Sequence, residues 1–531
     1  MVETVPDLLT SAAQHYGRRT ALITPDKLLS FTELKRLADN FGDGLSARGI
    51  SPGDRIVLWL GNSWRWVVAY YGALSIGAEV VPANSLLSPD EVAYIVDHSD
   101  AKALIALHED LLRLLPYPTL PLIVSVGSAH AGAAEFDELL EPPRVENPTG
   151  LRARRAPTDV AEICYTSGTT GTPKGAILSH LSLVTNAQAM ALVHGKSALD
   201  VLGTALPCCH VYGTMVLNSA VAAGASLVLM PRFDEFALLT AIEQHEITVL
   251  EAVPAMYHAL MNTRRLERFN VKSLRLCSVG GQAMAESRLE EVETRLHCPL
   301  HELWGMTELA GPGTTHPYNT RRIAGSIGIP LPFTEMRIAD PVDTSRTMPI
   351  GQIGELVVRG PLVMNGYLNE PATTRNTITP DGWLRTGDLV LRDERGYLYL
   401  VDRLKDVILS GGYTLYPAEI ERVISTFPAV ALAAVVSVDD QMRGQIAKAV
   451  VTLRPDTRCE PEDLIAHCRQ HLAKYKVPRQ VEIVDFLPTG PTGKLLRREL
   501  RQRTSPRGNA AAAFPQDANL AMPGQVTGVL E

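Results

Sequence analysis

The hydrophobic pattern from Asp7 to Leu303 alternates between short apolar runs and amphipathic segments. A short apolar run is typical of a buried strand, and apolar residues spaced three and four apart are typical of a helix. Strands are predicted over 54–60, 79–82, 201–206, 225–230, 248–253, 274–279 and 300–303, and helices from Thr32, Trp66, Met215, Phe236 and Pro254. Strands that alternate with helices favour parallel sheets, so we expect a large α/β domain with layered, mostly parallel sheets.

The C-terminal part of the chain has a different pattern. A strand over 389–392, a polar turn and a strand over 397–401 predict a hairpin. From Ala418 to Leu500 the order is helix, strand, strand, helix, strand, which predicts a small α+β unit. From Ser505 to Glu531 the chain is rich in Ala, Pro and Gly, and we expect a disordered tail.

Composition and charge limit the classes of function that the chain can have. The net charge is -8 and the pI about 6.0, which gives no sign of a nucleic-acid partner. No apolar run is long enough to span a bilayer, and Met1–Thr10 carries acids where a signal peptide would carry bases. The seven cysteines are scattered without a Cys-x-x-Cys pair, which favours free thiols in a reducing compartment. We expect a cytoplasmic enzyme without a structural zinc site.

The most informative stretch runs from Tyr165 to Gly175, Tyr-Thr-Ser-Gly-Thr-Thr-Gly-Thr-Pro-Lys-Gly. Glycines let backbone N–H groups approach an anion, hydroxyls can donate to phosphate oxygens, and Lys174 adds a positive charge. The spacing differs from a Walker loop, and Pro173 disfavours a direct run into a helix. Apolar runs on both sides fit either strand–loop–strand or strand–loop–helix. We interpret the stretch as a polyphosphate loop.

This stretch resembles the phosphate loop of the adenylate-forming (acyl-activating) superfamily. That group includes acyl-CoA synthetases, firefly luciferase and the adenylation domains of peptide synthetases. Further motifs occur in the family's order, so the resemblance covers about Leu8 to Leu500.

Two further elements match the family's nucleotide site. Trp304-Gly305-Met306-Thr307-Glu308 resembles its aromatic-Gly-x-Thr-Glu element, with Trp where Tyr is common. The resemblance implies that the ring stacks on adenine, the hydroxyl reaches a phosphate and the carboxylate of Glu308 holds Mg²⁺. Gly281, Gln282 and Ala283, which follow Gly280, resemble the loop that borders the adenine. Each of these motifs follows a predicted strand, where doubly wound sheets bind ligands.

His210 and its neighbours resemble the family's gate between the ATP site and the acyl pocket. No carboxylate lies between Pro207 and Val216, which counts against an amino acid substrate. By family position the acyl pocket would be lined by His210, Val211, Tyr212, Gly213, Met215, Val253, Met306 and Leu309. Apart from the gate histidine these residues are apolar or small, which favours a fatty or aromatic acid. A small, malonate-type dicarboxylate stays open, because Arg321-Arg322 is either a surface pair or an acid-binding pair.

The remaining family motifs lie toward the C-terminus. Asp388 follows a Thr-Gly pair, and we expect an exposed carboxylate that accepts the ribose hydroxyls, with Arg403 reaching the same ribose. Lys405 takes the position of the hinge residue, and Gly411 and Gly412 that of the passage for the pantetheine arm of CoA. Lys494, after Pro-Thr-Gly, resembles the catalytic lysine. The implied organisation is a large domain over 1–402, a hinge over 403–406, a small mobile domain over 407–504 and a disordered tail over 505–531.

The resemblance implies an ATP-dependent acid–thiol ligase that forms an acyl adenylate and then acyl-CoA, with ATP, Mg²⁺ and CoA taking part. The expected catalytic residues are Thr166, His210, Glu308 and Lys494, with Glu308 at the metal. The expected nucleotide and CoA contacts are Thr166, Ser167, Gly168, Thr169, Thr170, Gly171, Lys174, Gly281, Gln282, Ala283, Trp304, Gly305, Met306, Thr307, Asp388, Arg403, Gly411 and Gly412. Alternatives are a ligase that loads an acyl carrier protein in trans, a luciferase-like oxygenase and a silent nucleotide-binding regulator. A homodimer also stays open.

Overall fold

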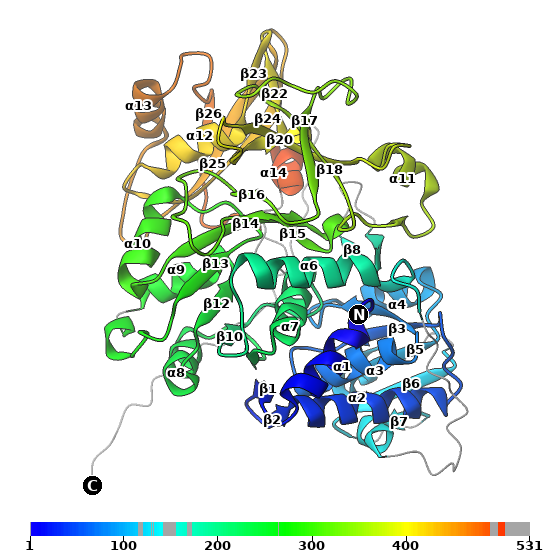
Figure 1. Cartoon of the computed structure of the whole chain (residues 1–531). Coiled ribbons are helices and arrows are strands. Elements are labelled where there is room, and N and C mark those ends of the chain that lie inside the picture. The colour runs from blue at the N-terminus through cyan, green and yellow to red at the C-terminus, as the bar shows by residue number, and fades with distance from the viewer. Residues whose placement is uncertain are drawn as a thin grey trace. The chain divides into compact units, whose positions relative to one another are not determined.

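The computed structural model describes residues 2–114, 120–128, 130, 132–141, 155–166, 173–263, 265–488 and 497–504. The chain divides into two compact units, Met1–Lys405 (unit 1) and Asp406–Glu531 (unit 2). Figure 1 gives the labels of their helices and strands. Within the described ranges, no helix has the length and apolar character that a membrane crossing requires. The predicted disordered tail lies outside the described residues.

The first sheet of unit 1 runs in the order β16-β15-β14-β13-β12-β10-β11-β1-β2. Its strands are β1 (Thr20–Thr24), β2 (Lys27–Ser30), β10 (Val201–Thr204), β11 (Ser226–Leu229), β12 (Val249–Ala252), β13 (Leu276–Val279), β14 (Leu300–Met306), β15 (Gly311–Thr315) and β16 (Ile329–Pro330). From β1 through β11, β10, β12 and β13 to β14 neighbouring strands are parallel, while β2, β15 and β16 join antiparallel. The carboxyl ends of the parallel strands therefore share one edge of the sheet.

The second sheet of unit 1 runs in the order β19-β9-β8-β4-β3-β5-β6-β7. Its strands are β3 (Arg55–Trp59), β4 (Glu79–Ala83), β5 (Ala103–Leu107), β6 (Leu122–Val126), β7 (Ala134–Glu135), β8 (Val160–Thr166), β9 (Lys174–Ser179) and β19 (Gly366–Tyr367). β8 and β9 pair antiparallel, so the predicted phosphate loop joins two strands rather than a strand and a helix.

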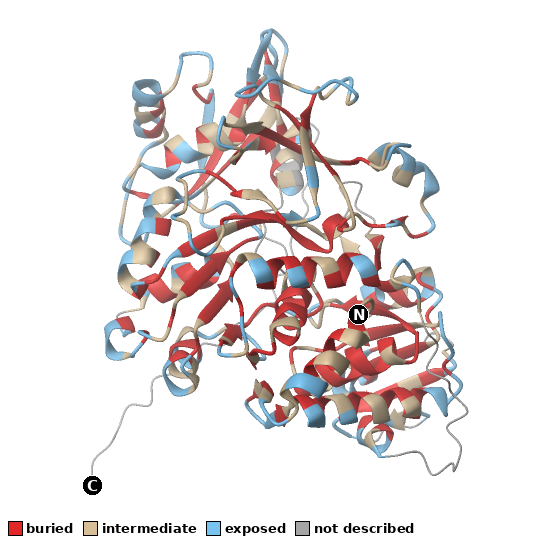
Figure 2. Cartoon of the chain, viewed as in Figure 1, coloured by how far each residue is buried: buried red, intermediate tan, exposed pale blue. Residues whose placement is uncertain are grey.

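The helices of unit 1 are α1 (Val5–Tyr16), α2 (Phe31–Ser46), α3 (Trp64–Ser75), α4 (Pro89–His98), α5 (His108–Arg113), η1 (Phe136–Leu140), α6 (His180–Val193), α7 (Val211–Ala223), α8 (Glu235–His245), α9 (Pro254–Asn262), η2 (Leu266–Arg268), α10 (Glu286–Leu296), η3 (Thr307–Leu309) and α11 (Pro371–Thr377). α6 packs on α7 and also touches β9 and β15, one strand from each sheet (Figure 1). Residues 213–221 of α7 are buried, which confirms the prediction of a buried helix there. Figure 2 shows the strands of both sheets largely in the colour of buried residues.

Specific contacts hold this core together. A Cβ on Gly42 of α2 would come 2.6 Å from the carbonyl oxygen of Gly72 of α3, so only glycine permits this close helix crossing. Asn218 of α7 accepts a hydrogen bond of 2.8 Å from the hydroxyl of Tyr71 and donates one of 3.1 Å to Tyr70, both on α3. Because these polar atoms are buried, their mutual hydrogen bonds fix the packing of α3 on α7.

A third sheet of unit 1 contains β17 (Glu335–Ala339), β18 (Gly354–Arg359), β20 (Leu384–Arg392) and β21 (Leu398–Arg403), and every pair in it is antiparallel. The expectation of mostly parallel strands therefore holds for the central parts of the two larger sheets only. The predicted hairpin over 389–401 is confirmed as β20 and β21, but β20 begins at Leu384.

Unit 2 is α+β, as predicted. It contains β22 (Ile408–Ser410), β23 (Tyr413–Leu415), α12 (Pro417–Ser425), β24 (Val430–Asp440), β25 (Gly444–Leu453), α13 (Pro461–His471), β26 (Gln480–Ile483) and α14 (Arg497–Thr504). The short helix η4 (Leu404–Asp406) spans the boundary between the units. Ile420 of α12, Val435 of β24, Val451 of β25 and Leu464 of α13 belong to one buried hydrophobic cluster, so unit 2 has its own core.

Candidate active site

The hairpin of β8 and β9 presents the two ends of the predicted phosphate loop. Thr166 ends β8, Lys174 begins β9, and the two residues are register partners. The hairpin therefore holds the loop ends side by side, at the rim of a parallel sheet. Between them, Ser167, Gly168, Thr169, Thr170 and Gly171 lie outside the described residues.

Tyr367 of β19 links Lys174 to Glu308. The Lys174 ammonium lies 5.6 Å from the centre of the Tyr367 ring and 3.6 Å from a carboxylate oxygen of Glu370. The Tyr367 hydroxyl donates a hydrogen bond of 2.7 Å to Oε1 of Glu308, whose side chain is buried. Burial and the neighbouring Glu308 charge raise the pKa of Tyr367, so its hydroxyl keeps the proton that it donates. Two residues predicted from separate motifs thus meet through one tyrosine.

Neither Tyr367 nor Glu370 was predicted from the sequence. β19 is two residues long, and it joins the sheet by pairing Gly366 with Ile177 and Tyr367 with Ala176 of β9. The one local signal was the turn-forming pair Asn365-Gly366 immediately before this aromatic residue.

A second group brings together Trp304, Asp388 and Arg403. The indole Nε1 of Trp304 donates a hydrogen bond of 2.8 Å to Oδ2 of Asp388, and Nε of Arg403 lies 3.2 Å from Oδ1. The prediction of an exposed Asp388 carboxylate is wrong, because Asp388 lies inside β20 and is 4% exposed. Its charge is compatible with burial because Arg403 on the neighbouring strand β21 faces it.

The aromatic-Gly-x-Thr-Glu element is also placed differently from the prediction. Trp304, Gly305 and Met306 are the last residues of β14 rather than residues beyond its end. Trp304 is 7% exposed, and a Cβ on Gly313 would come 3.0 Å from Cζ3 of its ring. A Cβ on Gly305 would come 2.2 Å from the carbonyl oxygen of Gly311, so the β14–β15 crossing itself requires this glycine. Thr307 opens η3.

The loop after β13 is open to solvent. Gly281, Gln282 and Ala283 are exposed, and Gly281 has a φ of 88°, a conformation that favours glycine. A Cβ on Gly281 would lie 3.6 Å from Val253, which follows β12. The loops after two neighbouring parallel strands thus lie together at the sheet edge.

His210 is the residue before α7, and a neutral ring fits its surroundings. Its Nε2 lies 3.1 Å from Nδ2 of Asn84, whose Oδ1 accepts a hydrogen bond of 2.9 Å from the Leu86 N–H. An amide nitrogen only donates, so Nε2 accepts and the proton of the neutral ring is on Nδ1. Burial lowers the pKa of His210. Asn84 was not predicted, because it lies far from His210 in sequence.

The residues expected to line the acyl pocket fall into two groups by exposure. Val211, Tyr212, Val253 and Met306 are half-buried, and Gly213, Met215 and Leu309 are buried. The Cβ direction of Gly213 is filled by the carbonyl oxygen of Pro207 at 2.2 Å, so this glycine lets the Pro207 loop pack on α7.

The two arginines considered for binding a dicarboxylate have different surroundings. Arg321 is exposed, whereas Arg322 lies 2.7 Å from Glu286 and 3.2 Å from Glu293. Two carboxylates already neutralise Arg322, which counts against an acid-binding pair.

Unit 2 carries the predicted CoA glycines in a tight turn. Gly411 and Gly412 join β22 to β23 and have φ values of 56° and 83°. Two residues with positive φ form the turn that best fits a two-residue hairpin, so this turn alone accounts for glycine at both positions. Lys405 is the last residue of unit 1, and its hinge role stays a prediction. Lys494 lies outside the described residues.

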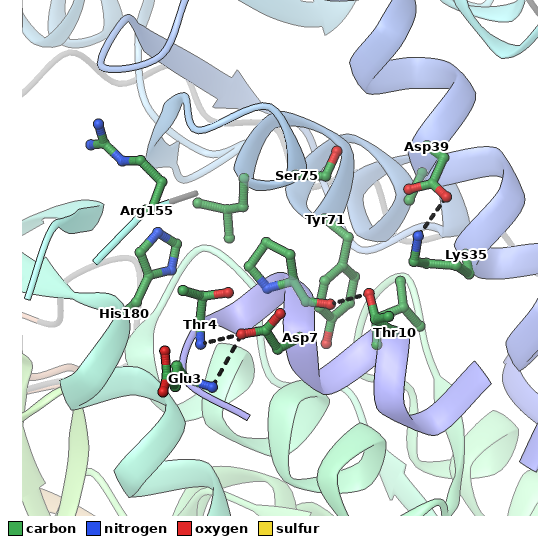
Figure 3. Close-up of a pocket in the computed structure, with 14 residues that line it drawn as sticks. Glu3, Thr4, Asp7, Thr10, Lys35, Asp39, Tyr71, Ser75, Arg155 and His180 are labelled. Carbon is green, nitrogen blue, oxygen red and sulfur yellow. Dashed lines mark hydrogen bonds and ion pairs between the residues drawn. The ribbon is translucent and has the colours of Figure 1, made fainter. Parts of the chain in front are cut away.

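The pocket in Figure 3 contains none of the predicted residues. It is lined from α1, α2 and α3 together with Arg155 and His180. Lys35 pairs with Asp39, and Oδ2 of Asp7 accepts hydrogen bonds from the N–H groups of Glu3 and Thr4. These acids serve helix capping and a surface ion pair, so we do not assign the chemistry to this pocket.

Comparison with known proteins gives matches over most of the chain. Residues 9–368 match the AMP-binding enzyme family, and residues 419–494 match the AMP-binding enzyme C-terminal domain. A (7a-methyl-1,5-dioxo-octahydro-1H-inden-4-yl)propanoyl:CoA ligase from Mycobacterium tuberculosis is 34% identical, over 94% of this chain and 99% of the relative. A long-chain-fatty-acid–CoA ligase from Yersinia pestis is 32% identical, over 96% of this chain and 95% of the relative. The solved structure of the anthranilate CoA ligase AuaEII with anthranoyl-AMP matches with a TM-score of 0.86 at 28% identity, over 94% of this chain and 97% of that one.

Proposed function

The chain belongs to the family of AMP-binding enzymes and is an adenylate-forming acid–CoA ligase, and on this premise we propose how its residues divide the reaction. A carboxylate is a poor acyl donor because oxide would have to leave. In the first step the carboxylate attacks the α-phosphate of ATP and expels pyrophosphate. In the second step the thiol of CoA attacks the acyl adenylate and AMP leaves.

The observation that carries this assignment is the contact of Trp304, Asp388 and Arg403. Asp388 is an acceptor-only carboxylate that Trp304 and Arg403 hold in one orientation. A carboxylate, with two acceptor oxygens, is also the kind of group that can accept the two ribose hydroxyls. We assign the ribose of ATP to Asp388 and Arg403, and the adenine to Trp304 and the exposed loop of Gly281, Gln282 and Ala283.

The polyphosphate would lie at Thr166, Lys174 and the loop between them. Glu308 fits a magnesium ligand, because one carboxylate oxygen is held by Tyr367 and Mg²⁺ in ATP sites takes few protein carboxylates. Within the described residues no cluster of three or more His, Cys, Asp or Glu side chains could hold a metal, so phosphates and water would supply the remaining ligands. The ion would offset phosphate charge while Lys174 and Thr166 orient the chain of phosphates.

Transfer of the phosphoryl group depends on positioning and charge more than on acid–base catalysis. We assign to Lys494 the charge on the reacting α-phosphate, and to Gly411 and Gly412 the passage of the pantetheine arm in the second step. Rotation of unit 2 about Lys405 would exchange the two surfaces.

We propose a hydrophobic acid as the substrate, with His210 as a neutral gate. Half-buried Val211, Val253 and Met306 support an apolar pocket, and the neutralised Arg322 disfavours a dicarboxylate. The ring-bearing and long-chain acids of the relatives are both hydrophobic.

A panel of acids assayed for pyrophosphate release, with and without CoA, tests this function. We expect pyrophosphate with at least one hydrophobic acid, and acyl-CoA only when CoA is present. Adenylate that accumulates with CoA but transfers to an acyl carrier protein would support the carrier alternative instead. Nucleotide binding without pyrophosphate from any acid would support a silent regulator, and a product that requires oxygen would support a luciferase-like enzyme.

A further inference from the structure

A buried ion pair that the proposed chemistry does not use lies in unit 1. Nζ of Lys196 is 2.7 Å from Oε1 of Glu251, and both side chains have 0% exposure. The Lys196 ammonium also donates a hydrogen bond of 2.9 Å to the hydroxyl of Ser219 on α7. Two buried charges are tolerated only where further hydrogen bonds satisfy them, so this pair is part of a larger network.

The network reaches the edge of the sheet where the acyl group would bind. Glu251 of β12 and Ser278 of β13 are register partners on neighbouring parallel strands, each one residue before its strand ends. The Ser278 hydroxyl donates to Oε2 of Glu251. Val253 follows β12 and Gly280 follows β13, so the network lies directly beneath the loops assigned to substrate.

Tyr212 connects this network to the predicted acyl pocket. It stands in the first turn of α7, two residues after His210, and its hydroxyl donates a hydrogen bond of 3.1 Å to Oε2 of Glu251. The same hydroxyl lies 3.2 Å from Oγ of Ser278. A Cβ on Gly280 would come 3.2 Å from Cε1 of Tyr212, so the ring lies against the backbone that follows β13.

At this end of the network both carboxylate oxygens of Glu251 accept hydrogen bonds from protein side chains. Oε1 of Glu251 accepts from Lys196, and Oε2 accepts from Tyr212 and Ser278. The hydroxyl of half-buried Tyr212 is thus turned to the carboxylate, which leaves the apolar ring as the surface that an acyl group can meet. A long acyl chain could pass only if the Tyr212 ring moved aside. The buried carboxylate of Glu251 would then lose one hydrogen-bond donor and would face hydrocarbon, and both changes are unfavourable.

We propose that Tyr212, anchored by the buried Lys196–Glu251 pair, closes the far end of the acyl site and makes the enzyme select compact acids, ring-bearing or short, over long straight-chain acids. This rests on the proposed function, because it takes His210 and Val253 to border the acyl group. Tyr212 is then a specificity-determining residue, and Lys196 and Glu251 are positioning residues.

The test is the chain-length profile of kcat/KM for pyrophosphate release, measured with straight-chain acids from butanoate to hexadecanoate and with benzoate, phenylacetate and 3-phenylpropanoate. For the wild type we expect hexadecanoate to fall about 10²-fold below the best ring acid, the order of discrimination that a closed apolar pocket gives. Tyr212→Ala should raise kcat/KM for decanoate and longer acids at least about tenfold relative to ring acids.

Two further variants make the test specific. The double variant K196M/E251L removes the anchor as a pair, so that neither charge is left unpaired, and should broaden the profile in the same direction. Tyr257→Phe is the matched control. Like Tyr212, Tyr257 has a hydroxyl that bonds at Ser278, where it donates to the backbone carbonyl oxygen 3.0 Å away, but Tyr257 is a core residue of α9. Its profile should match that of the wild type.

A wild type that uses hexadecanoate as well as ring acids would overturn the inference, as would an unchanged profile in both Tyr212→Ala and K196M/E251L. In either case ring acids would still release pyrophosphate, so the ligase function would stand. Absence of pyrophosphate with every acid and every variant would instead overturn the ligase function and the inference together.

Discussion

The pH dependence of stability at Glu162 tests quantitatively how the β8–β9 hairpin is packed. Glu162 lies in β8, four residues before Thr166, with 0% exposure, and the thiol of Cys164 donates to its Oε2 at 3.3 Å. Burial raises the pKa of Glu162 from 4.5 to about 7. Between these pH values the folded state keeps the proton and the unfolded state loses it, so stability falls as pH rises through this window. At 1.36 kcal/mol per pKa unit, the free energy of unfolding loses about 3 kcal/mol between pH 4.5 and pH 7.

Glu162→Gln should remove this dependence, because glutamine stays neutral. We expect the free energy of unfolding of the variant, minus that of the wild type, to rise by about 3 kcal/mol from pH 4.5 to pH 8. Urea unfolding followed by tryptophan fluorescence measures it, since every tryptophan of the chain lies in unit 1. Glu290→Gln, at an exposed position of α10, is the control and should leave the difference flat. A flat difference for Glu162→Gln as well would refute the assignment of a buried, protonated carboxyl.

Three further variants test the site itself. Tyr367→Phe removes the hydroxyl that donates to Glu308 but keeps the ring beside Lys174. A hydrogen bond to a charged group contributes about 1.5–3 kcal/mol, so kcat/KM for ATP should fall about 10–100-fold. The variant should also need a higher Mg²⁺ concentration. An unchanged Mg²⁺ titration would contradict the role of Tyr367. Lys494→Ala should slow adenylation about 10²–10³-fold and spare thioester formation from preformed acyl adenylate, and equal losses in both steps would reject the assignment of Lys494. Gly411 has a φ of 56°, where any side chain strains the backbone, so Gly411→Leu is compared with Gly411→Ala. Leucine should slow thioester formation about tenfold more than alanine does. Equal rates in the two variants would show that Gly411 does not lie on the path of CoA.

In the two larger sheets, strands β3, β4 and β10 to β14 could be predicted because they carry a local signal, whereas strands such as β1, β5 and β15 were not predicted. β12 and β13 are short apolar runs between polar segments, and the buried α7 is apolar nearly all round. The predicted start of β20, at residue 389, was too late because the first half of this strand is polar. In the fold, Arg385 pairs with Glu355 of β18 at 2.6 Å, and the Thr386 hydroxyl donates to the Leu356 carbonyl oxygen at 2.7 Å. Such partners lie about thirty residues away, where a local pattern gives no information.

The same limit applies to the site. The motifs identified Trp304, Glu308 and Asp388 by residue type, and the fold brings Trp304 to Asp388 through strands that are far apart in sequence. Tyr367 and Asn84 carry no motif and enter only through non-local contacts. The hydrogen-bond network of Tyr212, Glu251 and Lys196 could not be predicted either, because these residues are far apart in sequence and a buried ion pair has no sequence signature.

The position of the nucleotide tests the central assignment most directly. We expect a crystal soaked with a non-hydrolysable ATP analogue and Mg²⁺ to show the ribose hydroxyls within hydrogen-bond distance of Asp388, and the terminal phosphates at Lys174. A nucleotide bound away from both residues would contradict the proposed site.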